Sequence, residues 1–114
     1  MAEMEEKEHY IKMAEFTTAP GGRYRKDGEK SGEEFRDEHL LPAVLAALEA
    51  GKTVTIDLDG VIGYGSSFLE EAFGGLERAL AKEGKSARNV IKFVSQRRPY
   101  LIPKIEGYMN AANN

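Results

Sequence analysis

The 114-residue chain contains no cysteine and only two histidines. Without cysteine it can form neither disulfides nor thiolate metal sites, and thiol catalysis is excluded. His9 and His39 lie far apart with no ligand-like spacing around either, so the sequence predicts no metal site and no cofactor. Sixteen basic residues stand against nineteen acidic ones, a net charge of −3, which gives no indication of a nucleic-acid partner.

Long apolar runs are also missing. The longest, LLPAVLAAL, falls well short of the ~20 residues that a membrane-spanning helix needs. No basic segment followed by an apolar stretch opens the chain, so no secretion signal is expected. With 41% hydrophobic residues, the composition predicts one globular domain over residues 9–114, cytoplasmic and without membrane contact, after a flexible acidic segment at residues 1–8.

Hydrophobic spacing in the first half of the chain predicts one strand and one helix. Residues 9–16, HYIKMAEF, suit a short strand. After a long loop, Ser31 begins a helix through a capping box with Glu34, and Gly51 is the stop signal. Pro42 lies inside this helix, so we expect a kink or a division there.

The second half of the chain continues the alternation of strands and helices. Residues 52–58 and 89–95 are rich in β-branched side chains and predict strands, while residues 66–84 and 100–112 show helical spacing. The order is therefore β-α-β-α-β-α. It predicts a small α/β sandwich in which helical crossovers connect a mostly parallel sheet flanked by helices.

The sequence IDLDGV at the end of the second predicted strand allows an enzymatic interpretation. It resembles the nucleophile loop of haloacid-dehalogenase-type phosphatases, in which Asp57 would attack a phosphoryl group and Asp59 would act as general acid and base beside Mg²⁺. Ser95 and Lys104 could hold the phosphate, but no later acidic pair completes the magnesium site. An aspartate before glycine is also a common turn device. The Mg²⁺-dependent phosphotransferase is therefore the alternative, and a non-enzymatic role is preferred.

The same strand end, together with the residues after it, favours a regulatory domain. IDLDGV followed by GSSFL matches the strand, loop and serine-bearing helix of anti-sigma-factor antagonists and STAS domains. GGRYRKDGEKSGEEFR and SSFLEEAFGGL extend the likeness, so that over residues 9–95 the chain resembles a bacterial STAS-like family of unassigned function. The resemblance implies a non-catalytic, protein-regulating STAS-like sandwich. It also implies a protein partner, a serine kinase of the histidine-kinase-like ATPase type.

The two serines of GSSFL have different expected roles. In the antagonists the first serine of the pair is phosphorylated, which by resemblance is Ser66, with Ser67 as the second choice. Ser67 has a competing role, because SFLE is a capping box that would pair it with Glu70. A phosphate on Ser66 would gain from the helix N-terminus but would be repelled by Glu70 and Glu71.

The loop and helix start around these serines form the predicted partner surface. The aspartate before the pair and the glycine after it in the antagonists are Gly65 and Phe68 here. The residues expected to contact a partner are Gly63, Tyr64, Gly65, Ser66, Phe68, Glu70, Glu71 and Gly74.

Two further features leave alternatives open. Gly74 and Gly75 interrupt a helix at roughly 1 kcal/mol each relative to alanine, so either close packing or a docked partner must offset that cost. The loop at residues 21–32 combines glycines and basic side chains ahead of a helix start, which predicts a nucleotide- or small-anion-sensing domain as a third possibility. Its expected anion contacts are Arg23, Arg25 and Lys26.

Overall fold

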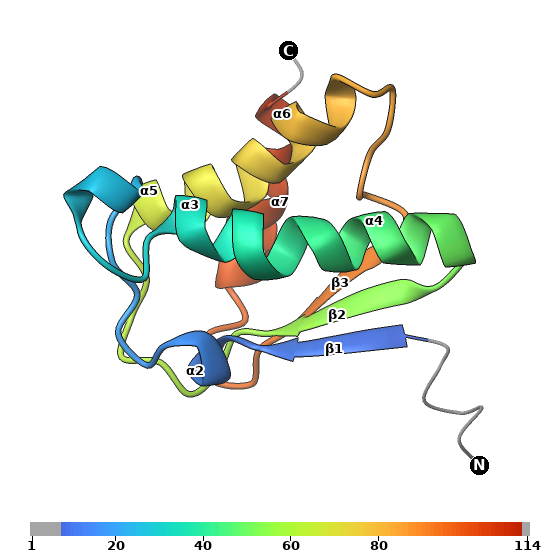
Figure 1. The fold of residues 1–114 in the computed structure, drawn as a ribbon. Helices are drawn as coiled ribbons and strands as arrows, with labels where there is room; N and C mark the ends of the chain where they lie inside the picture. The colour runs from blue at the N-terminus through green and yellow to red at the C-terminus, as the bar shows by residue number, and fades with distance from the viewer. Residues whose placement is uncertain (1–7, 113–114) are drawn as a thin grey trace.

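A three-stranded parallel sheet organises the computed structural model, which describes residues 8–112 (Figure 1). The strands β1 (Glu8–Lys12), β2 (Thr53–Asp57) and β3 (Ile91–Val94) lie in the order β1-β2-β3. The predicted α/β class and parallel sheet are therefore confirmed, with β2 in the centre. The flexible segment expected at residues 1–8 lies outside the described residues, except for Glu8, which begins β1.

The main helices cover one face of this sheet. The register aligns Ile11, Ile56 and Phe93 across the three strands, and the Phe93 ring meets the Phe73 ring at a centroid distance of 5.3 Å. Figure 1 shows α4, α6 and α7 on the same side of the sheet. Tyr10 and Lys92 belong to the opposite face and are exposed. The flanking helices that the sequence predicts thus lie on one side of the sheet.

The first helical segment consists of α3 (Gly32–Phe35), a π-helical turn (Arg36–Leu40) and α4 (Leu41–Ala50). The Ser31 hydroxyl accepts the Glu34 N–H at 3.0 Å, as the capping motif predicts, whereas the Glu34 carboxylate accepts the Lys30 N–H. Gly51 ends the segment with φ 69°, in the left-handed conformation that glycine adopts without steric cost.

The division expected at Pro42 occurs just before it, in the π-helical turn. There the Leu41 N–H bonds to the Arg36 carbonyl, five residues earlier. Pro42 then occupies the first turn of α4, and it has no N–H to donate to the carbonyls of the π-helical turn before it.

The second helical segment contains another π-helical turn. It consists of α5 (Ser66–Leu69), the turn Glu70–Gly74 and α6 (Gly75–Ala81). The N-cap is Gly65, in an extended conformation and without a side-chain cap. The prediction of Ser67 as the N-cap is therefore wrong, because the helix begins earlier and Ser67 lies inside it.

The remaining elements are shorter or lie at the end of the chain. The strand predicted over residues 9–16 ends at Lys12, and the chain turns into the short helix α2 (Met13–Phe16). A 3-10 turn (Arg25–Asp27) lies within the following loop. The last helix, α7 (Leu101–Ala111), packs against the π-helical turn of the second segment. Its buried residues are Leu101, Ile105 and Met109.

Aromatic side chains fill the core between these helices. Phe35, Phe68 and Phe73 are fully buried, and the ring centroid of Phe35 lies 6.2 Å from each of the other two. Glu77 is buried as well, and its carboxylate accepts the Ser86 hydroxyl at 2.9 Å and the Ala87 N–H. These bonds satisfy the buried carboxylate and fix the connection from α6 to β3.

The close approach of α3 to α5 generates the first testable prediction. A Cβ at Gly32 would lie 2.5 Å from the Phe68 carbonyl oxygen, which is backbone and cannot move aside cheaply. Helix propensity alone favours alanine there by about 1 kcal/mol. We expect the opposite, a loss of roughly 1–3 kcal/mol for Gly32→Ala from overpacking, measured by urea unfolding.

Gly63→Ala is the matched control, because a Cβ at Gly63 meets open space. We expect it to change the free energy of unfolding by at most about 0.5 kcal/mol. A Gly32→Ala protein as stable as the wild type would show that the two helices do not approach this closely.

Candidate functional site

The carboxylates Asp57 and Asp59 brace the end of the sheet. Asp57 Oδ1 accepts the Asp59 N–H at 3.0 Å. Asp59 in turn accepts the Gln96 N–H at 2.7 Å and the Ser95 hydroxyl at 2.8 Å. The Gln96 bond, assisted by Ser95 and Arg97, holds the pKa of Asp59 below its ordinary value. Both side chains therefore serve the loops after β2 and β3.

Other groups of the protein form hydrogen bonds with the residues of the predicted phosphotransferase site. Ser95 donates its hydroxyl to Asp59, and Asp57 Oδ2 accepts the Tyr10 hydroxyl at 3.3 Å. Within residues 8–112, no group of three histidine, aspartate or glutamate side chains could hold a metal ion. The structure gives the two aspartates a bracing role at this edge of the sheet.

The loop from Leu58 to Gly65, which we call the docking loop, is clamped from several sides. Its Ile62 N–H donates to the Thr18 carbonyl at 2.9 Å. The Arg98 guanidinium donates to the carbonyls of Val61 and Ile62 at 3.0 and 3.1 Å. These bonds fix the tip of the loop, while the Ile62 side chain remains 78% exposed.

Tyr64 supports the same loop from inside. Its hydroxyl donates to the Leu58 carbonyl at 2.7 Å, and its ring packs 6.1 Å from the ring of Phe68. Burial raises the pKa of the Tyr64 hydroxyl, so it stays protonated as a donor. Sequence reasoning missed Ile62; the available signal was an apolar pair within the glycine-rich run GVIGYG.

The residues predicted to contact a partner fall at different depths. Gly65, Ser66 and Ser67 are exposed. Phe68 lies in the core, so its expected contact with a partner is wrong for this conformation. The remaining predicted contacts divide into half-buried positions, Gly63, Tyr64 and Glu70, and buried ones, Glu71 and Gly74.

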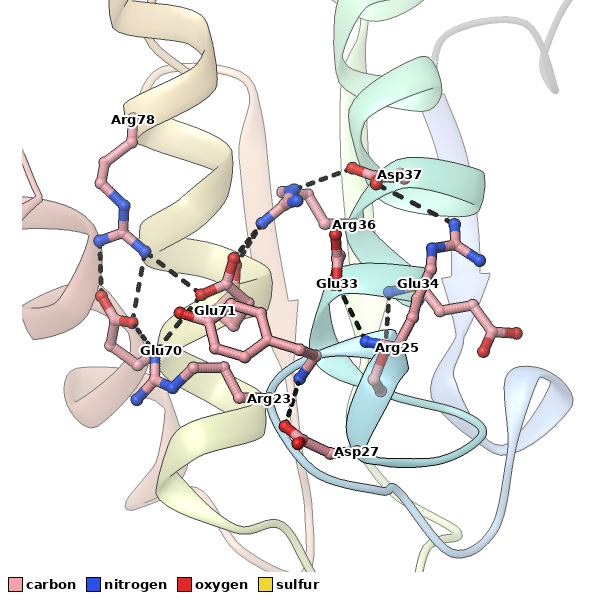
Figure 2. Close-up of polar contacts among 12 residues, drawn as sticks. Arg23, Arg25, Asp27, Glu33, Glu34, Arg36, Asp37, Glu70, Glu71 and Arg78 are labelled. Carbon is pink, nitrogen blue, oxygen red and sulfur yellow. Dashed lines mark hydrogen bonds and ion pairs between the residues drawn. The ribbon is translucent and has the colours of Figure 1, made fainter.

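A half-buried ionic cluster lies one turn beyond the serines. We call it the arginine–glutamate cluster: Arg23, Arg36, Arg78, Glu70 and Glu71 (Figure 2). Arg36 Nη1 donates to Glu71 Oε2 at 2.5 Å and to the Glu71 carbonyl at 3.2 Å. Arg23 and Arg78 bind the Glu70 carboxylate from either side. The cluster therefore ties the loop before α3 to both helical segments.

The two mid-helix glycines make room for this cluster. A Cβ at Gly75 would lie 2.5 Å from Arg36 Nη1, and a Cβ at Gly74 would lie 2.7 Å from Glu70 Oε2. Both glycines are buried. Of the two explanations that the sequence left open, these contacts support close packing within the chain.

The basic loop is turned toward the protein's own carboxylates. Arg23 pairs with Glu70, and Arg25 pairs with Glu38 at 3.0 Å. The Lys26 ammonium lies 5.6 Å from the Tyr24 ring. Two of the three expected anion contacts, Arg23 and Arg25, therefore form ion pairs with glutamates of the same chain.

A parallel sheet covered by helices on one face, followed after its central strand by a helix that begins with two serines, defines a small STAS-like α/β domain. The model of one family, the STAS-like domain of unknown function (DUF4325), matches residues 31–96, more than half of the chain, and the chain belongs to this family. No curated protein and no solved structure matches it. Across residues 8–112, no helix is long and apolar enough to cross a membrane.

Removing one charge from the cluster should destabilise the fold. In Glu71→Gln, Arg36 keeps a charge at a site where its side chain is only 14% exposed, and we expect a loss of about 2–3 kcal/mol. Glu83→Gln is the control, because the Glu83–Lys85 pair is exposed and should contribute at most about 0.5 kcal/mol. Equal free energies of unfolding for the two variants would contradict the role given to Arg36 and Glu71.

The pKa of Glu70 leads to a pH dependence. Hydrogen bonds from Arg78 and then Arg23 lower this pKa below the ordinary value of 4.5. A lowered pKa in the folded state stabilises the fold above the unfolded value, and this stability is lost as pH falls through the folded value. Wild type should therefore exceed Glu70→Gln in stability at neutral pH, and the difference should shrink below pH 4.5. Urea unfolding over this range tests it; a constant difference would refute the assignment.

Proposed function

We propose that the chain is a non-catalytic regulatory domain that binds a protein partner through the docking loop and the exposed start of α5. The observation that carries this proposal is the exposed side chain of Ile62, held on a loop whose backbone is fixed by Arg98 and Thr18. Membership in the STAS-like family supports a regulatory role.

The fixed backbone of the docking loop lowers the entropic cost of binding a partner. A loop that is already ordered loses little conformational entropy when a partner docks, so more of the contact energy contributes to affinity. An aliphatic side chain at the tip can fill an apolar pocket on the partner, and the polar positions around it, Gly65 and Ser66, would form the rim.

Phosphorylation of Ser66 is the proposed control of this surface. Ser66 is exposed and is the first residue of α5. A phosphate there would be attracted by the helix N-terminus. The repulsion expected from Glu70 and Glu71 is offset, because three arginines neutralise both carboxylates. The added charge of about −2 would then stand beside the apolar contact and weaken docking. A serine kinase of the histidine-kinase-like ATPase type is the proposed partner class.

Site-specific photo-crosslinking in the native host tests the docking surface. A crosslinking residue at position 62 should capture a specific regulatory protein. The same residue at position 94, where Val94 is exposed on the uncovered sheet face, should not. With the captured protein purified, Ile62→Asp and Ser66→Asp should each weaken its binding by about tenfold or more, and Val94→Asp should leave it unchanged.

Two results would contradict the proposal. Capture from position 94 in place of position 62 would move the interface to the sheet. Unchanged affinity of Ile62→Asp, with its fold intact by circular dichroism, would remove the docking loop from the interface. If Ile62→Asp weakens binding and Ser66→Asp does not, the docking surface stands and the phosphorylation control is rejected.

A further inference from the structure

A groove of about 320 Å³ lies between the two helical segments, beside the arginine–glutamate cluster. Three cationic side chains line it, Arg36, Arg78 and Lys82, and Leu41 and Ala79 add apolar surface. Figure 2 shows Arg36 and Arg78 extending from neighbouring helices toward Glu71. The docking loop contributes no residue to this groove, so a ligand bound in the groove does not depend on the proposed function.

Each of the three cations has hydrogen-bonding capacity left over. Arg36 uses Nε for Asp37, at 3.0 Å, and Nη1 for Glu71, so Nη2 has no acceptor among residues 8–112. Arg78 uses Nη1 and Nη2 for Glu70, which leaves Nε without an acceptor in the same residues. Lys82 makes no ion pair within the described part of the chain. Three cationic residues, one from each helical segment and one directly after α6, thus line a single groove.

The charges around the groove do not balance. The cations are Arg23, Arg36, Arg78 and Lys82, four in all, whereas the carboxylates are Asp37, Glu70 and Glu71, three in all. The groove therefore carries a surplus of one positive charge on a chain whose net charge is −3. Asp37 and Glu71 also line the groove, but each is bound to Arg36 and so repels an incoming anion less.

We propose that this groove binds a phosphate monoester, with Arg36 Nη2, Arg78 Nε and Lys82 Nζ as the donors to its oxygens. The terminal oxygens of a phosphate can accept hydrogen bonds from several side chains at once. Guanidinium and ammonium groups are the usual protein ligands of phosphate. Gly75 contributes by its size, because a Cβ there would displace Arg36 and close the space between the helices.

The phosphate proposed on Ser66 is a different group in a different place. Arg78 lies about 18 Å along the helical axis from Ser66, at 1.5 Å of rise per residue. A phosphate on Ser66 therefore cannot bind Arg78 and Lys82, at the far end of this groove, in its own chain. The ligand must be a separate molecule, either a small phosphate metabolite such as a nucleotide or a phosphorylated side chain of another protein; both present the same monoester group.

Isothermal titration at constant ionic strength, with chloride as the balancing anion, tests the site. The probes are inorganic phosphate, adenosine monophosphate, and a phosphoserine peptide with its unphosphorylated twin. Wild type should bind phosphate saturably, and Lys82→Ala should bind it about fivefold more weakly. Lys104→Ala is the matched control, an exposed lysine on α7, and should bind like wild type. Tighter binding of the nucleotide or of the phosphopeptide than of phosphate supports the site and identifies the source of the monoester.

Three results would overturn the proposal. The first is that no phosphate-bearing probe binds saturably. The second is that Lys82→Ala and Lys104→Ala weaken phosphate binding equally. The third is that the two peptides bind equally well while inorganic phosphate does not bind. Because Lys82 is exposed, its substitution should leave the fold intact, which circular dichroism and thermal unfolding of both variants verify. Arg36→Lys is a second variant. It keeps the positive charge but replaces the several N–H donors of the guanidinium with a single ammonium group, and it should also weaken phosphate binding.

Discussion

The ion pair between Arg36 and Glu71 is the contact on which the helical layer depends. Two charged side chains that are mostly withdrawn from water are tolerated only when paired and hydrogen-bonded, and here Arg36 also binds the Glu71 backbone carbonyl. The pair fixes how the two helical segments lie against each other. Arg23, Arg78 and Glu70 join it at the surface, which brings the basic loop to the start of α5.

Both partners of this pair sit in π-helical turns, and the turns explain a spacing that the sequence already contains. Phe35 and Leu40 are both fully buried yet five residues apart, a separation that a regular α-helix would rotate away from the core. The added residue in the turn brings both to the same face. Arg36, directly after Phe35, is thereby directed across to the second segment, where Gly75 leaves the space for it.

The candidate site has two parts. Family membership suggests the exposed surface around Ser66, but it says nothing about the contacts that hold this surface in place. Ser66 and the loop before it are exposed, as a regulatory surface requires. Their positions come from residues distant in sequence: Thr18 and Arg98 hold the tip, and Asp59 ties the loop after β2 to the loop after β3. Ile62 becomes a candidate anchor only through these contacts, because an isolated exposed isoleucine has no special meaning.

The sequence by itself determined what depends on neighbouring residues. The order of strands and helices, the Ser31 cap and the Gly51 stop all follow from local spacing and short-range hydrogen bonds, and they are as predicted. The tertiary structure alone decided what depends on partners far along the chain. Glu70 binds Arg23, 47 residues away, and so does not cap a serine. Phe68 is buried in the core. Arg23 and Arg25 of the basic loop form ion pairs with glutamates. Which carboxylate meets which arginine is set by the packing of the helices, and local pattern carries no information about it.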